Sequence, residues 1–305
     1  MSVCIVARYR KNTIITATDR KISFGSFFSS EGNAKKLLPV RDNWVAMVAG
    51  TDISPSVPIL NAIRASKKES KTVEQFAAIC RDAFRQERQI AIESEVLGRY
   101  GMAMAEFKRH NAFPPNVYEH IVSQIDSVKL KCTFLFAGFD EKPAPHILTL
   151  SEPGNVQYQD RSDFWAIGAG QHNAMSSLAQ YPSYNCHDSI GACVYRVIAA
   201  KLSAESARDV GRPTYIGIYC RDQRVGISLS GEIMDEVRQK WMELAARIPE
   251  DVEERILFEL AACGWFVKTH PESAKGEEIR LHSASDNAFP AFKRMLDEGS
   301  KESKH

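Results

Sequence analysis

Two apolar segments near the start of the chain, separated by a polar turn, constrain its fold more than any other feature. Residues 3 to 7 and 13 to 18 are apolar or β-branched, and residues 8 to 12 between them include two arginines, a lysine and an asparagine. Such runs joined by a polar turn are typical of paired β-strands. The pattern predicts a β-hairpin whose second strand ends at Asp19.

Four residues before, within and after this hairpin follow an order that suits hydrolytic chemistry. If Met1 is removed, Ser2 carries a free amine and a hydroxyl in one residue. Asp19 supplies an acid, Lys36 supplies a cation, and Gly50 ends an apolar run at a turn. A glycine lets the backbone approach a scissile carbonyl and aim an N–H at the negative charge that develops on it. We interpret these residues as a candidate catalytic set.

Each member of this set has a distinct expected role. An alkyl hydroxyl is a weak nucleophile at neutral pH, and an N-terminal amine, with an ordinary pKa of about 8, is a suitable base for it. A protonated Lys36 beside the hydroxyl would favour the developing negative charge and lower the pKa of the amine. Asp19 would hold that ammonium and offset the cost of burying it.

The order of these residues resembles the proteasome β-subunit superfamily of N-terminal-nucleophile hydrolases, including its ancestral-β relatives. The resemblance covers the first third of the chain, with weaker matches at residues 130 to 140 and 166 to 170. It implies that Ser2 replaces the N-terminal threonine of the family. It also implies that Asp19 is the buried aspartate, Lys36 the catalytic lysine and Gly50 the oxyanion-hole glycine.

Three positions leave the details of this resemblance open. Lys35 competes with Lys36 for the role of the lysine, although the apolar spacing after Lys36 favours the latter. Glu205 begins a segment that resembles the Asp-Ser-Ala motif of the family, whereas Asp209 matches its Arg-Asp pair; we favour Glu205 as the second acid. Ala169 stands where the family has a serine that would supply a hydroxyl near the amine.

The succession of elements predicts an α+β fold. Strands, then helices, then strands, then helices fit a four-layer αββα sandwich with two antiparallel sheets face to face, and the resemblance implies the same architecture. We expect an N-terminal-nucleophile domain over residues 2–231 with a helical insertion at about 72–130. A helical extension at 232–305 should end in a disordered polar tail from 298 onward.

Individual elements can also be placed. A helix is predicted from Ser54, whose hydroxyl would cap it, and a longer one from Thr72 to Phe107, broken near Gly98 and Gly101. Further strands are expected at 130–138, 145–150, 163–168 and 215–219, and further helices at 189–202 and from 232 onward.

The composition of the chain bears on which partners, compartment and cofactors are expected. A net charge of +1 gives no electrostatic case for a nucleic-acid partner, and no apolar run approaches the ~20 residues that span a membrane. Seven widely spaced cysteines without a CxxC pair favour reduced thiols in a cytoplasmic chain. The eight histidines lack metal-ligand spacing, so neither a metal nor another cofactor is expected.

Two functions remain after these exclusions. The first is a proteasome-like peptidase or amidohydrolase, a cytoplasmic homo-oligomer that acts on a peptide or protein substrate in an enclosed space. Since the chain has no phosphate-binding GxxxxGK[ST] motif, an ATP-driven step would need a separate unfoldase. The second is a catalytically inactive scaffold or interaction protein of the same fold. No propeptide precedes Ser2, so we expect simple methionine excision.

Apolar side chains after residue 232 bear on assembly. They recur at helical spacing, and a monomer must either expose them or fold them back onto its own core. This surface predicts a homo-oligomer. The residues concerned are Trp241, Leu244, Ile256, Leu257 and Leu260.

Overall fold

The structure is a computed structural model of the 305-residue chain. It describes residues 2–10, 12–24, 28–30, 36–41, 43–109, 113–142, 144–180, 190–221 and 231–245. One compact unit spans Met1–Ala246. Met1, Lys35, the helices expected beyond residue 246 and the tail from 298 lie outside the described residues.

Most of the described β-structure belongs to two antiparallel sheets. The strands are β1 Val3–Tyr9, β2 Thr13–Asp19, β3 Ile22–Phe24, β4 Phe28–Ser30, β5 Leu37–Arg41, β6 Trp44–Gly50, β7 Cys132–Phe139, β8 Pro145–Ser151, β9 Asn155–Tyr158, β10 Phe164–Gly168 and β11 Thr214–Cys220. The first sheet has the order β10-β1-β2-β11, the second has the order β5-β6-β7-β8-β9, and β3 pairs with β4. The predicted hairpin is confirmed, because β1 and β2 pair with Cys4 opposite Thr18.

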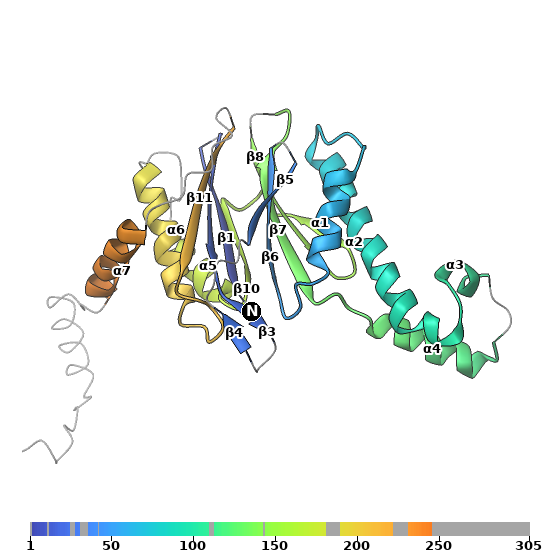
Figure 1. Ribbon diagram of the computed structural model, residues 1–305. Helices are drawn as coiled ribbons and strands as arrows, with labels where there is room; N and C mark the ends of the chain where they lie inside the picture. Colours follow the sequence, from blue (N-terminus) through green and yellow to red (C-terminus); the bar gives the residue numbers. More distant parts are fainter. Residues whose placement is uncertain are drawn as a thin grey trace, which may run out of the picture. The chain divides into compact units, whose positions relative to one another are not determined.

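Helices lie on the outer faces of both sheets (Figure 1). The described helices are α1 Ser56–Ala65, α2 Val73–Glu95, the 3₁₀ helix η1 Leu97–Tyr100, α3 Met104–Phe107, α4 Pro115–Ser127, α5 Gln171–Ala179, α6 Ile190–Ala204 and α7 Gly231–Ala245. Those that pack on the sheets are α1 and α2 on the second and α5 and α6 on the first. The predicted break after the long helix is confirmed, because η1 ends at Gly101 in the left-handed conformation.

The start of α1 differs from the prediction. This helix begins at Ser56, and its N-cap is Pro55, which contributes no side-chain hydrogen bond. The N–H of Ser54 donates to Asp52 Oδ1 at 2.9 Å, so Ser54 belongs to a turn that precedes the helix. The predicted capping role of Ser54 is therefore wrong. The physical reason is a turn that starts at Asp52, in which the Asp52 carboxylate binds the Ser54 N–H and the Ile53 carbonyl accepts from the Ser56 N–H at 3.0 Å.

Three apolar clusters join the helices and sheets. One joins the first sheet to α5 and α6, with α7 packed against it, and includes Val3 and Ile5. A second lies between the second sheet and helices α1 and α2, and includes Phe76. The third contains Cys4 and Met47 and lies between the two sheets. Alternate residues of β1 thus face helices and the second sheet, which explains why its sequence is apolar throughout.

Helix α7 folds its apolar side back onto the first cluster. Met234 is buried there, and Val237 and Trp241 are partly buried against the same residues. The sequence left two outcomes for the apolar residues after 232, exposure or packing against the chain's own core, and these side chains pack against the core. The side chain of Leu244 is not among those described, and residues 256 to 260 lie outside the described part of the chain. The proposed boundary at 231 stays a prediction.

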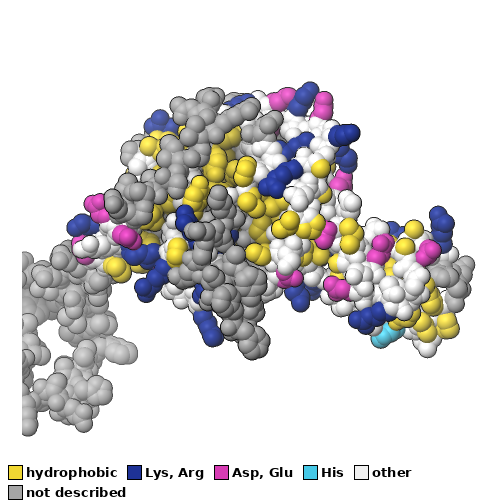
Figure 2. Space-filling model, in the orientation of Figure 1, with side chains coloured by type: hydrophobic (Ala, Val, Ile, Leu, Met, Phe, Trp, Pro, Cys, Tyr) yellow, Lys and Arg dark blue, Asp and Glu magenta, His cyan; other side chains and the backbone are white. Residues whose placement is uncertain are grey.

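The segment from η1 to α4 projects beyond the second sheet as a helical arm (Figures 1 and 2). It has an apolar cluster of its own, which includes Leu97, Phe107 and Ile121. The Phe107 ring stacks on the ring of Tyr118 with centroids 5.2 Å apart. Tyr100 and Tyr118 remain exposed on this arm. In the part of the chain that the structure describes, no helix is long and apolar enough to cross a membrane.

Candidate active site

The fully buried carboxylate of Asp19, at the end of β2, is the centre of the candidate site. Its Oδ1 accepts hydrogen bonds from Lys36 Nζ at 2.8 Å and from the Val3 N–H at 3.1 Å. Its Oδ2 accepts from the backbone N–H groups of Lys21 at 3.2 Å and Gly211 at 3.1 Å. A buried charge is tolerated only when it is paired and hydrogen-bonded, and all four donors meet that need.

Lys36 immediately precedes β5 and is itself buried, with 7% of its surface exposed. Its ammonium forms an ion pair with Asp19. Removing one partner of such a pair leaves an uncompensated charge in the interior. The structure therefore brings together the two charged residues that the sequence singled out, from segments 17 residues apart.

Ser2 lies next to this ion pair and is 4% exposed. The peptide bond that joins it to Val3 supplies the N–H that reaches Asp19 Oδ1, the same oxygen that binds Lys36. Gly168 pairs with Val3 from the neighbouring strand β10. A Cβ on Gly168 would lie 2.1 Å from the Ser2 carbonyl oxygen, and this glycine has a φ of +96°. Close packing against Ser2 therefore requires glycine at position 168.

Gly50 ends β6 opposite Cys132. A Cβ at this position would lie 2.3 Å from the Lys131 carbonyl oxygen and 2.8 Å from Cys132 Cα. The close approach of β7 by itself accounts for a glycine here. The role of the Gly50 N–H as an oxyanion donor stays a prediction.

A cavity of about 530 Å³ opens between the ends of these strands. Its wall includes Gly50, Cys132, Gly168 and Ala169, so it adjoins the residue that packs against Ser2. Burial, with a further contribution from nearby acidic groups, raises the pKa of the Cys132 thiol to about 12. Ligand pockets commonly have volumes of about 300–1,000 Å³, so the cavity has the size of a binding site.

Cys4 is the second side chain of β1 and is fully buried between the sheets. Its Sγ lies 3.6 Å from the Val48 carbonyl oxygen. Burial raises the pKa of this thiol to about 12, although the positive charge of Lys36 opposes the shift. A thiol that stays protonated at neutral pH is a poor nucleophile, so Cys4 does not compete with Ser2.

Glu205 follows α6 and is held by two cations. Lys201 Nζ donates to its Oε1, and Arg238 donates to both carboxylate oxygens. Among the described residues, no hydrogen bond joins Glu205 to Ser2. Its role as the second acid stays a prediction, as does the alternative Asp209, which is half-buried.

Sequence reasoning missed two residues of this site, Lys201 and Gly211. Lys201 lies on the apolar face of α6, four residues after Val197 and three after Ile198. A lysine at a core position, four residues before Glu205, is a signal that could have identified it. Gly211 had no such signal, because its contact with Asp19 joins residues 192 positions apart.

The described residues contain no group of three or more His, Cys, Asp or Glu side chains that could hold a metal ion.

Comparison with solved structures places the fold. The chain is similar to the Anbu (ancestral β-subunit) from Yersinia bercovieri, with 14% sequence identity and a TM-score of 0.55 over 81% of this chain and 98% of that one. A Gly-1 mutant of Anbu from Hyphomicrobium sp. strain MC1 has 16% identity and a TM-score of 0.58, over 82% and 99% of the two chains. The chain shares its fold with Anbu.

These findings correct the family identification made from the sequence. No family model and no curated protein matches the chain. At 14 to 16% identity, the likeness to Anbu shows a common fold alone. Membership of the proteasome β-subunit superfamily is therefore not supported. Short motifs carried the identification, and they cover too little of the chain to establish it.

We predict that Gly168→Ala destabilises the protein by about 3 kcal/mol or more, because a Cβ there collides with the Ser2 carbonyl in addition to straining the backbone. Gly101→Ala is the matched control, since Gly101 also has a positive φ but a Cβ added there would have no neighbour within 4 Å. That change should cost about 1 kcal/mol. Urea unfolding measures both. Equal costs would contradict the close approach to Ser2.

Proposed function

We propose that the chain is a proteasome-like subunit that hydrolyses peptide or amide bonds with Ser2 as nucleophile, after removal of Met1. One observation carries the proposal. The peptide that joins Ser2 to Val3 and the ammonium of Lys36 bind the same oxygen of Asp19. Gly168, which packs against the Ser2 carbonyl, also lines the cavity of about 530 Å³, and this supports a substrate site close to Ser2.

The proposed reaction begins with proton transfer from the Ser2 hydroxyl to the Ser2 amine. The hydroxyl oxygen attacks the scissile carbonyl carbon, and the Gly50 N–H receives the negative charge that forms on the carbonyl oxygen. The amine then passes its proton to the leaving nitrogen, which departs and leaves an ester on Ser2. Water attacks this ester, the acid product leaves and the hydroxyl regains its proton. The Lys36 ammonium stabilises the developing negative charge, while Asp19 holds it in place.

The architecture in this proposal is a four-layer αββα sandwich. Helical clusters on the outer face of each sheet and a third cluster between the sheets support it. The domain is proposed to span residues 2–231, with the insertion at about 72–130 and the extension at 232–305. Glu205 remains the proposed second acid, because it begins the segment that resembles the Asp-Ser-Ala motif.

Assembly is also part of the proposal. A structural neighbour of this chain is described as a β-subunit, and the projecting arm exposes Tyr100 and Tyr118. These features support a homo-oligomer. We propose that it acts on peptide or protein substrates in the cytoplasm. An ATP-dependent unfoldase would be a separate partner. An inactive scaffold is the alternative, which Ala169 favours because it offers no hydroxyl beside the amine.

Ser2→Ala should reduce peptide or amide hydrolysis by about a thousand-fold or more, because it removes the nucleophile. Ser2→Thr, which keeps the hydroxyl, is the matched control and should retain turnover. Mass spectrometry should show a mature chain that begins at Ser2. Undiminished turnover in the alanine variant, or an active protein that retains Met1, would sink the serine mechanism.

Lys36→Met and Asp19→Asn should each lower kcat strongly, and the double variant should lose little more, because the two residues act as one unit. Lys36→Met should also raise the pH needed for activity, since the amine loses a positive neighbour and binds its proton more tightly. Lys35→Met should have a much smaller effect. Steady-state kinetics over a range of pH test this, and additive losses or a stronger effect of Lys35→Met would refute it.

Light scattering of the purified protein should give a mass several times that of one chain. Deletion of residues 247–305 removes the part of the extension that follows α7. The mass of this variant tests whether that part makes the contacts between subunits. A monomeric full-length protein would contradict the proposal that an oligomer encloses the space in which hydrolysis takes place. A folded oligomer without turnover on any peptide library would favour the scaffold.

A further inference from the structure

Lys201 is a fully buried lysine on α6 whose three donors are all used. Its ammonium donates to Glu205 Oε1, to the Gly211 carbonyl at 2.7 Å and to the Arg212 carbonyl at 2.7 Å. A lysine ammonium has three N–H groups and no acceptor, so this set saturates it.

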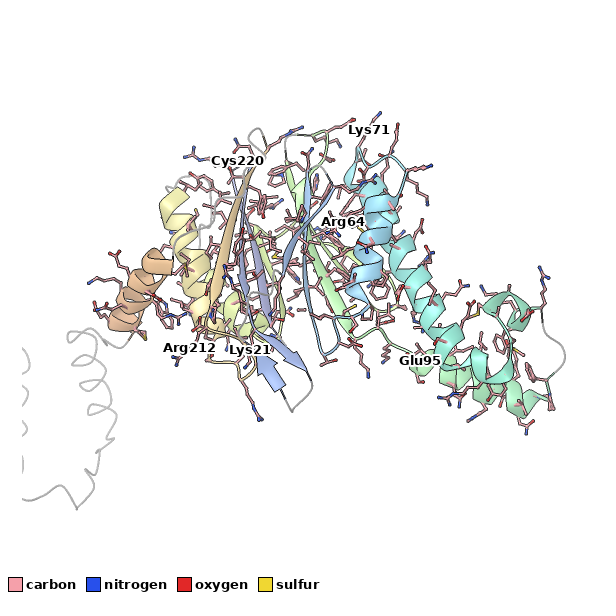
Figure 3. All side chains as sticks on the ribbon, in the orientation of Figure 1. Lys21, Arg64, Lys71, Glu95, Arg212 and Cys220 are labelled. Carbon is pink, nitrogen blue, oxygen red and sulfur yellow. The ribbon has the colours of Figure 1, made fainter. Side chains whose placement is uncertain are left out.

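The two carbonyls belong to the turn that binds Asp19. The Gly211 N–H donates to Asp19 Oδ2 at 3.1 Å, while the Gly211 carbonyl accepts from Lys201. Glycine is required at this turn, because a Cβ would lie 2.5 Å from the Cβ of Lys21. Figure 3 shows Lys21 and Arg212 close to each other at the end of the first sheet where the chain starts. Lys201 thus holds the turn on one side while Asp19 binds it on the other.

Arg238 of α7 binds the same turn from a second helix. It donates to Glu205 Oε1 at 2.9 Å and to the Arg212 carbonyl at 3.0 Å. Glu205 therefore connects two cations, Lys201 and Arg238, and both of them also bind the turn. The backbone at 211 and 212 is fixed by side chains from α6 and α7 together.

The charge of Lys201 is costly at this position. Burial lowers the pKa of Lys201, which means that the interior penalises its charge; the positive charge of Arg238 acts in the same direction, and Glu205 and Asp19 oppose the shift. An apolar side chain on the same face as Val197 and Ile198 would avoid that cost, and buried ion pairs are often no more stable than well-packed apolar residues. Nor does Lys201 cap its own helix, because α6 ends at Ala204, before the carbonyls it binds.

We propose that Lys201 is a positioning residue for Asp19. It fixes the turn at Gly211 and Arg212 so that the Gly211 N–H meets the carboxylate, and the carboxylate in turn directs the Lys36 ammonium. Glu205, held by Arg238, orients Lys201 and so acts on the site through it. This inference rests on the proposed function and adds to it a support that reaches the ion pair from α6 and α7.

The test compares Lys201→Met with Lys201→Gln, which keeps a donor without the charge, and with Lys240→Met, a control at an exposed lysine of α7. Lys201→Met should lower kcat by about 10- to 100-fold, the usual result of a small misplacement of catalytic groups, and leave KM within about twofold, because Lys201 does not line the cavity. Lys201→Gln should recover part of kcat. Lys240→Met should match the unaltered chain.

Amide hydrogen exchange followed by NMR gives a second readout that needs no turnover. The Gly211 amide should exchange at least about tenfold faster in Lys201→Met, while the Gly217 and Tyr219 amides, which the register of β11 pairs with β2, keep their rates. If Lys201→Met does not fold, the comparison uses Lys201→Gln and Arg238→Met, in which the Gly211 amide should also exchange faster.

The outcomes separate this inference from the proposed function. A chain without hydrolytic activity would end the peptidase proposal, and the exchange rate of Gly211 would still decide whether Lys201 fixes the turn. Unchanged exchange at Gly211 overturns the inference. Faster exchange with unaltered kcat in an active protein also overturns it, because the turn would then have no part in catalysis. A rise in KM with kcat unchanged would place Lys201 in substrate binding and refute the positioning role.

Discussion

The carboxylate of Asp19 is the interaction on which the rest of the site depends. A single negative charge, fully buried, requires a cation and several N–H donors, and the chain supplies them from four separate places. Meeting that requirement brings the start of β1, the residue before β5 and the turn before β11 to one point. The positions of Val3, which follows Ser2, and of Lys36 follow from this electrostatic demand, since both residues donate to Asp19 Oδ1.

Features that depend on local pattern were predictable from the sequence. The hairpin of β1 and β2 follows from two apolar runs around a polar turn, and the end of η1 follows from Gly101, which tolerates a left-handed backbone. The pairing of Asp19 with Lys36 was expected from motif order, and their catalytic roles remain predictions. The order of these motifs did not establish the family of the chain, because a few matching positions among 305 residues do not define a family.

Features that depend on distant contacts were not predictable. Asp19 meets Gly211 across 192 residues, and nothing near either residue announces the contact. Helix α5 and the short strand β9 were missed, because one is brief and the other is mostly exposed. The lysine of α6 was recognisable only as a charge on an apolar face, and its three acceptors become evident only when the turn folds back onto it.

The buried thiol of Cys4 can serve as a chemical probe of the interface between the two sheets. Its sulfur lies against Val48, in the layer that both sheets share, and burial keeps it protonated. An alkylating reagent can reach it only when the sheets separate near the ion pair. The rate at which Cys4 is modified in the native state therefore measures how often this part of the interior opens, and a bound substrate that closes the neighbouring cavity should slow it.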